Sequence, residues 1–324
     1  MHRRHLLLLA LGGAQTAPRT AWSQTFPTRP LRIVVPNAPG GAADITARTV
    51  AQRLGAALGQ SVVVDNRPGA GGVVAAELVA RAEPDGHTLL LVSSGTAVTA
   101  ALFRSLPFDT LADFAPVSML ATFDLAVVTA AGGRLQDLAQ LLAWARANPG
   151  RLNIGCPNIG TTQHLAAELF KASAGIDAQV VPFNGTPAVV TALRGGQIDA
   201  AIDILGPLMG QIASGVLRPL AVLGAQRSAQ LREVPAVRES GGPLAAFDVG
   251  SWNGLAVPAR TPPAVIAVLG RHLQETLAQP EVKGKLLELG LLARGSTPAA
   301  LGQHLKAEIE RWSGVIARAG IARQ

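Results

Sequence analysis

The sequence predicts an α/β protein of two lobes, because three observations agree. The chain has 324 residues, more than a single hydrophobic core usually organises. Hydrophobic residues make up 48% of it and charged residues 15%, a composition typical of folded globular proteins. From residue 31 onward, short β-branched runs alternate with helical stretches, which is the pattern of parallel sheets covered by helices.

The first α/β unit begins at residue 31. A helix over residues 45–58 repeats its apolar residues every four positions and ends at Gly59, a residue that commonly terminates helices. A second helix follows the glycine-rich segment 68–72. The expected strands are residues 31–35, 61–65 and 88–92.

The alternation restarts after Pro116 and predicts a second α/β unit. Its expected strands are residues 125–129, 152–155, 179–181, 198–202 and 217–223. Its expected helices are residues 135–147, 162–173 and 187–194.

The C-terminal part returns to the first lobe. After a Gly- and Pro-rich connection at 240–243, one strand is expected at 254–257, and then helices at 262–278, 282–289 and 298–319. Helices with one strand cannot form a sheet domain alone, so we expect them to pack on the first lobe. The chain would then cross between lobes near residues 120 and 245, and two crossings predict a hinge and an interlobe ligand cleft. The predicted bounds are 24–122 and 246–324 for lobe 1, and 123–245 for lobe 2.

The first 23 residues are typical of a signal peptide. Arg3-Arg4 precede an apolar run at 6–11, and Ala21-Trp-Ser23 fits a cleavage site. The apolar run is too short to anchor the chain in a bilayer. The two arginines resemble a twin-arginine export signal, with an ordinary Sec signal as the alternative.

Charge and cysteine content exclude several function classes. The net charge of +7 falls by three without Arg3, Arg4 and Arg19, and the other cations are scattered, which argues against nucleic-acid binding. Cys156 is the single cysteine, so neither a disulfide nor a cysteine-based metal cluster is expected. H-E-x-x-H, G-x-S-x-G and Walker motifs are missing. We therefore expect no enzyme activity, no cofactor and no metal.

The segment 35–48 contains the first candidate binding loop. It follows a predicted strand and opens a helix, and Gly40 and Gly41 let the backbone approach a ligand. Unpaired N–H groups of the first helical turn favour an anion there. Asp44 either caps the helix or accepts from a ligand donor. A plain β-to-α turn is the alternative.

A second loop of the same kind spans residues 155–164 in the other lobe. It again joins a strand to a helix N-terminus, and Thr161 and Thr162 add hydroxyl groups. Two such N-termini facing across a cleft would grip both ends of a dicarboxylate.

Three further segments follow predicted strands, where open α/β sheets bind ligands. They are Ser93-Ser94, Asn184-Gly185 and Asp203. Asn184-Gly185 is also an ordinary turn pair, and Asp203 is also suited to capping the next element.

Six motifs, in order along the chain, resemble one known family, the Bug-type solute receptors of tripartite tricarboxylate transporters. They occupy residues 28–41, 64–72, 84–90, 160–169, 195–199 and 252–258. The resemblance runs from about Phe26 to the C-terminus.

This resemblance implies a periplasmic binding protein with two Rossmann-like lobes that close on a small carboxylate: a di- or tricarboxylate, an acidic amino acid or an aromatic acid. It implies a membrane permease as partner, and we expect a monomer. A sensor that presents its closed form to a membrane signalling protein is the alternative. The implied ligand-binding residues are Ala38, Gly40, Gly41, Ala42, Ala43, Asp44, Ser93, Ser94, Asn158, Gly160, Thr161, Thr162, Asn184, Gly185 and Asp203.

Overall fold

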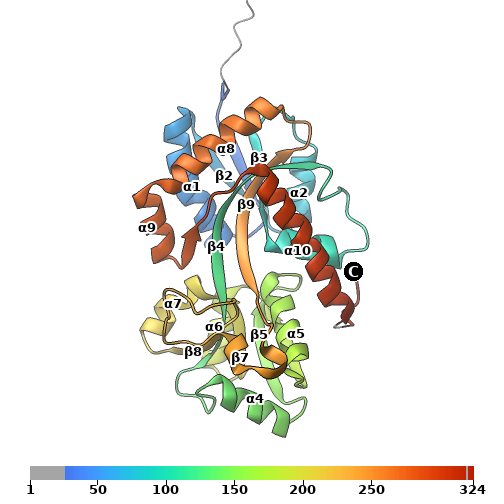
Figure 1. Cartoon of the computed structure of the whole chain (residues 1–324), viewed down its shortest axis with the longest axis vertical. Coiled ribbons are helices and arrows are strands. Elements are labelled where there is room, and N and C mark those ends of the chain that lie inside the picture. Colours follow the sequence, from blue (N-terminus) through green and yellow to red (C-terminus); the bar gives the residue numbers. More distant parts are fainter. Residues whose placement is uncertain (1–25, 319) are drawn as a thin grey trace, which may run out of the picture.

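The computed structural model describes residues 26–318 and 320–324 and has two α/β lobes, one above the other in Figure 1. The predicted signal peptide, residues 1–23, lies outside the described residues. No helix within the described ranges is long and apolar enough to cross a membrane.

Lobe 1 is built on the parallel strands β1, β2 and β3, to which β9 is added antiparallel. Its strands are β1 (Leu31–Val35), β2 (Val62–Asn66), β3 (Thr88–Ser93), β9 (Gly250–Pro258) and β10 (Leu291–Ala293). Its helices are α1 (Ala42–Leu58), the short η1 (Ala70–Gly72), α2 (Val73–Ala80), α3 (Ser94–Leu102), α8 (Pro263–Ala278), α9 (Pro280–Glu288) and α10 (Pro298–Arg318). The C-terminal helices α8 and α9 contact α1, and α10 contacts α3.

Lobe 2 is built on β5, which lies between β6 and β7 and is parallel to both. Its strands are β5 (Leu152–Pro157), β6 (Ala178–Phe183), β7 (Ala200–Ile204) and β8 (Leu217–Val222). Its helices are α4 (Leu138–Ala147), α5 (Thr162–Ala174), α6 (Thr186–Arg194), α7 (Leu205–Ala213), and the short η2 (Val237–Ser240) and η3 (Gly242–Leu244).

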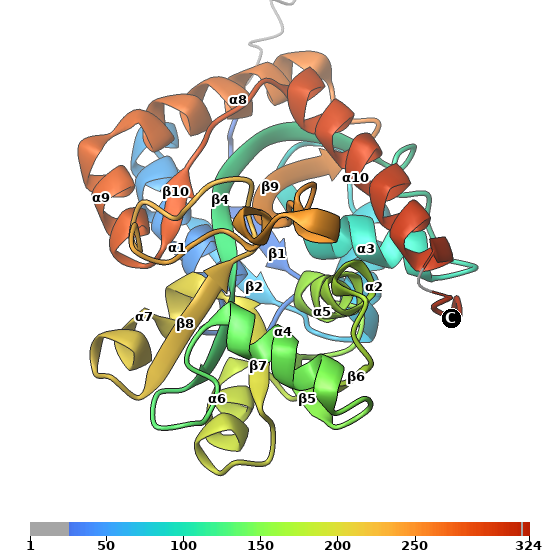
Figure 2. The same ribbon diagram turned by 60° about the horizontal axis from the view of Figure 1, so that its bottom comes forward.

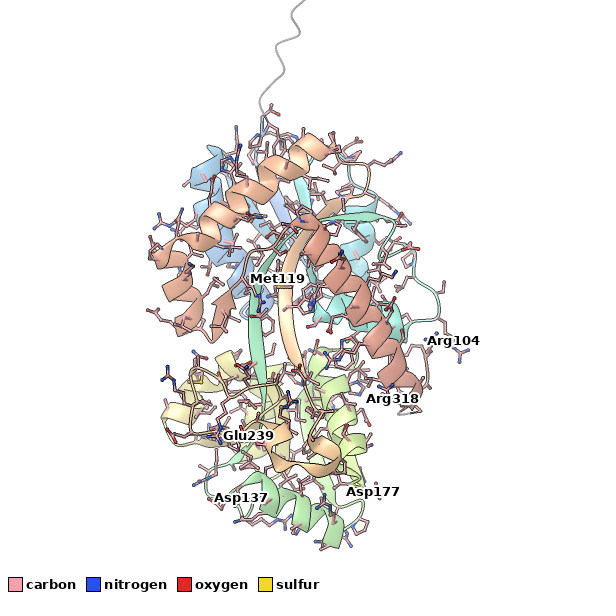
Figure 3. All side chains as sticks on the ribbon, in the orientation of Figure 1. Arg104, Met119, Asp137, Asp177, Glu239 and Arg318 are labelled. Carbon is pink, nitrogen blue, oxygen red and sulfur yellow. The ribbon has the colours of Figure 1, made fainter. Side chains whose placement is uncertain are left out.

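One long strand, β4 (Phe114–Ala130), belongs to both lobes. Its first part pairs with β9 and β10, and its last part with β7 and β8. Met119 marks the part within lobe 1 in Figure 3. The chain returns to lobe 1 just before β9, where Val249 donates its N–H to the carbonyl of Leu223. The chain thus passes between the lobes along β4 and again just before β9, and the predicted fold class is confirmed.

The sequence explains where several elements begin and end. Helix α1 buries Val50 and Leu54 completely and ends at Gly59, which has a φ of 65°, a left-handed conformation that glycine adopts without a Cβ penalty. Helix α4 begins at Leu138 and not at 135, because the Asp137 side chain accepts the N–H of Gln140 and caps it. The predicted strand 125–129 is only the last part of β4, which begins at Phe114, and the other predicted boundaries shift by a few residues.

Candidate functional site

The first turn of α1 presents unpaired backbone donors. Gly41 precedes the helix in an extended conformation, and no acceptor among the described residues takes the N–H groups of Ala42, Ala43 and Asp44. Such groups at a helix start favour an anion, because the positive end of the helix dipole lies there. The turn therefore has the unpaired donors that an anion would need.

Asp44 has a different role from the one expected for a ligand contact. Its side chain is 3% exposed, accepts the N–H of Gly40 at 2.9 Å and accepts Nε of Arg48 at 2.9 Å. The Gly40 N–H is thus already paired and is not a free ligand donor, which corrects the expectation for this group. Burial is the largest single effect on the pKa of Asp44 and raises it. The hydrogen bonds from Arg48 and Gly40 together outweigh burial, so the pKa lies below its usual value. Asp44 shapes the loop.

The first turn of α5 is the matching feature of lobe 2. Thr161 caps the helix, since its hydroxyl accepts the N–H of His164 at 3.2 Å. Among the described residues, the N–H groups of Thr162 and Gln163 have no acceptor. Gly160, with a φ of 76°, forms the turn before the cap.

A chain of buried hydroxyl groups joins the two lobes. Thr162 of lobe 2 donates its hydroxyl to Ser94 of lobe 1 at 2.7 Å, and Ser94 also bonds the hydroxyl of Ser251 on β9. Ser94 and Thr162 are the first residues of α3 and α5. The predicted loops that contain these two residues therefore meet directly.

Strand β9 supplies residues that sequence reasoning missed. Asn253, two residues after Ser251, donates its side-chain N–H to the hydroxyl of Thr46 in α1 at 3.2 Å. Side chains two residues apart on a strand lie on the same face, so β9 contacts α3 and α1 from one face. Ser251 lies outside every motif that the sequence offered, and the motif 252–258, which contains Asn253, gave no reason to place that residue near the two loops, because both residues lie far along the chain from them.

Asp203, the fourth residue of β7, is fully buried, as its 0% exposure indicates. One carboxylate oxygen accepts the N–H of Ile204 at 2.7 Å and the side-chain amide of Gln163 at 3.3 Å. The other oxygen, Oδ2, has no partner among the described residues. Burial raises the pKa of Asp203 to about 6, against the opposing effect of Thr186, Ile204 and Gln163.

The remaining predicted residues lie at the edge of this arrangement. Ala38, Asn158 and Asn184 are exposed, and the two loops of lobe 2 touch where the N–H of Asn158 meets the carbonyl of Phe183. Gly185 precedes α6, and the N–H of Ser93 is bonded to the hydroxyl of Thr96. The loops are neighbours, although the side chains of Asn158 and Asn184 make no contact with the buried hydroxyl groups.

Charged and reactive groups near the site are already engaged. The guanidinium of Arg48 bonds Asp44 and Asn66. Burial, with Asp203 and Glu168 nearby, raises the pKa of the Cys156 thiol to about 12, so this thiol stays protonated at neutral pH. The described ranges contain no group of three or more His, Cys, Asp or Glu side chains suited to a metal ion. A carboxylate would therefore bind here through neutral donors.

Comparison with known proteins gives a consistent result. A family model described as "Tripartite tricarboxylate transporter family receptor" matches residues 46–321. A protein from the tcbD-tcbE intergenic region of Pseudomonas sp. (strain P51) is 37% identical, over 97% of this chain and 93% of its own length. Protein BugT of Bordetella pertussis is 36% identical, over 92% of this chain and 91% of its own.

Solved structures share the fold. The R. palustris protein Rpa4515 with adipate superimposes with a TM-score of 0.85 at 33% identity, over 92% of this chain and 99% of its own. MatC from Rhodopseudomonas palustris with bound malate gives 0.81 at 32% identity, over 90% and 100% of the two chains.

Proposed function

Because the chain belongs to the tripartite tricarboxylate transporter family of receptors, we propose that it is an exported binding protein for a small carboxylate. One observation carries the proposal: unpaired N–H groups begin α1 in one lobe and α5 in the other, and Arg48, the cation in α1 next to the first of these turns, is already bonded to Asp44. A ligand with anionic ends fits such a pair of helix starts. The cargo would pass to membrane permease subunits of the tripartite tricarboxylate type, and the receptor would act in the periplasm as a monomer.

The two ends of the site have different roles in this proposal. One carboxylate of the ligand binds the turn from Gly41 to Asp44, where backbone donors are worth about 1.5–3 kcal/mol each towards a charged acceptor. The distal carboxylate of the ligand binds the unpaired N–H groups of Thr162 and Gln163 at the start of α5. Asp203 lies next to this turn through its bond to Gln163; because it is itself acidic, it disfavours a further anionic group there and so helps to set ligand preference.

The relatives support the ligand class. The two solved structures named above carry adipate and malate, both of which are dicarboxylates. No acid–base pair or reactive thiol of the described site suggests chemistry on a ligand, since Cys156 stays protonated. The site thus favours capture and release over turnover.

A thermal-shift screen of the purified mature protein tests the proposal. Adipate, malate, succinate, glutamate and nicotinate are added singly, with a neutral diamide of adipate as the matched control. A true ligand at a hundred times its Kd adds about 2.7 kcal/mol of stability, which raises Tm by several degrees. Calorimetry then gives the affinity. If the neutral diamide binds as well as the dicarboxylate, carboxylate recognition by backbone donors is wrong.

A further inference from the structure

Two glycines meet where the lobes touch beside the hinge. Gly206 lies in the first turn of α7 in lobe 2, and Gly290 lies between α9 and β10 in lobe 1. A Cβ on Gly206 would come within 3.0 Å of the Leu289 carbonyl, and a Cβ on Gly290 would come equally close to the Gly206 backbone. Real Cβ atoms essentially never approach backbone atoms this closely. The two backbones are therefore in contact, and neither position has room for a side chain.

Further interactions hold the lobes together at this point. Gln230 of lobe 2 donates its side-chain amide to the carbonyl of Leu287 in lobe 1 at 2.7 Å. Ile204 at the end of β7 packs with Leu289 against the apolar cluster beneath α1, α8 and α9. Figure 2 shows α7 below α9 and β10 on the same side of the molecule.

The glycine contact lies beside β4, close to the hinge. Strand β10 begins opposite Phe123 and β7 ends opposite Leu125. The two strands therefore meet along β4 at the place where it passes from one lobe to the other. The same β7–α7 turn holds Asp203, three residues before Gly206, so the candidate ligand site and the glycine contact share one short segment.

We propose that the Gly206–Gly290 contact is the stop against which the lobes close, and that both glycines are positioning residues for ligand capture. Their missing side chains let the backbones meet, which sets the angle between the lobes at which Thr162 reaches Ser94. A methyl group at Gly206 acts as a wedge that holds the lobes apart. The inference rests on the proposed function only for its effect on ligand affinity.

Gly206→Ala is the test, with Gly210→Ala as the matched control. Both positions lie in α7, neither has a positive φ, and a Cβ at the exposed Gly210 meets nothing within 4 Å. Spin labels are attached at Ala213→Cys in α7 and Lys285→Cys in α9, two exposed positions. Double electron–electron resonance then measures the distance between the two labels across the contact. The native Cys156 is buried and escapes labelling.

We expect Gly206→Ala to lengthen the label distance in the ligand-free protein, and Gly210→Ala to leave it unchanged. With adipate or malate as probe, Gly206→Ala should raise Kd at least tenfold through faster dissociation, while the association rate stays the same. If Gly206→Ala does not fold by circular dichroism, Gln230→Ala replaces it and should speed dissociation several-fold.

The distance and the affinity separate the two proposals. An unchanged label distance in folded Gly206→Ala overturns the stop, whatever ligand binds. So does unchanged dissociation of a bound probe in the variant used. A lengthened distance in a protein that binds none of the screened carboxylates supports the stop and counts against the proposed function.

Discussion

The substitution Asp203→Asn should remove part of the pH dependence of the free energy of unfolding. The ordinary pKa of this carboxyl group is 3.8, and burial raises it to about 6 in the folded protein. The unfolded chain therefore loses its proton first as pH rises, and ionisation favours unfolding. The contribution of this group to the free energy of unfolding therefore falls between pH 4 and pH 6 and then levels off. At about 1.4 kcal/mol for each unit of pKa, the loss from this group approaches ~3 kcal/mol.

Asparagine keeps the size of the side chain and removes the charge. Its amide faces the same unpaired position as Oδ2, which costs roughly 1–3 kcal/mol at every pH. The variant is thus less stable than the wild type at pH 4, and the difference closes or changes sign by pH 7. The change of the difference with pH is the quantity to measure, because the constant cost cancels in it.

Urea unfolding of the ligand-free protein, followed by circular dichroism from pH 4 to pH 8, measures this quantity. Asp177→Asn is the control, since Asp177 is exposed on the outside of the same lobe (Figure 3). Its curve should run parallel to that of the wild type. If the Asp203→Asn curve does too, the buried carboxyl group does not titrate in this range and the electrostatic reasoning fails.

Other predictions concern the first binding loop and export. Gly41→Val should weaken carboxylate binding at least tenfold, about 1.4 kcal/mol, with the fold retained; its Cβ meets only the Ala38 carbonyl, at 3.9 Å, and unchanged affinity by calorimetry would move the site elsewhere. Asp44→Ala should lower the free energy of unfolding by about 1–2 kcal/mol in chemical unfolding, because the Gly40 N–H and Arg48 lose their acceptor. An unchanged free energy of unfolding would show that these two hydrogen bonds do not stabilise the loop. The exported protein should begin at Gln24 by mass spectrometry, and a periplasmic chain still carrying Met1 would rule out cleavage after Ser23.

Local sequence patterns predicted most of the fold. The β1–β3 alternation and its restart in lobe 2 follow from apolar periodicity. The full length of β4 does not, because Pro116 and Asp124 interrupt the strand pattern. Pro116 lies where the register between β4 and β9 shifts, and proline is tolerated in sheets at such bulges. The strand β10 has too few residues to give a clear period. In α3 and α7 the glycines, with Pro207 in α7, interrupt the apolar pattern of a helix.

The candidate site was predictable only where it is local. Gly40, Gly41, Thr161 and Thr162 lie in loops whose strand–glycine–helix order signals a helix N-terminus. Ser251 has no such signal, because it joins the site through the pairing of β9 beside β3, across 157 residues of chain from Ser94. The pairing of Asp44 with the Gly40 N–H likewise depends on the exact path of the loop.

The shared strand β4 also bears on how proteins of this fold acquire new ligands. A recombination breakpoint between residues 122 and 123 cuts β4 at the point where it pairs with β9 and β10. A transplanted lobe must then match a foreign register on both edges of that strand. Each lobe is therefore a poor unit of genetic exchange, even though each has its own sheet. Diversification in this architecture is easier by substitution in the loops before α1 and α5, which can change without disturbing the strand that both lobes share.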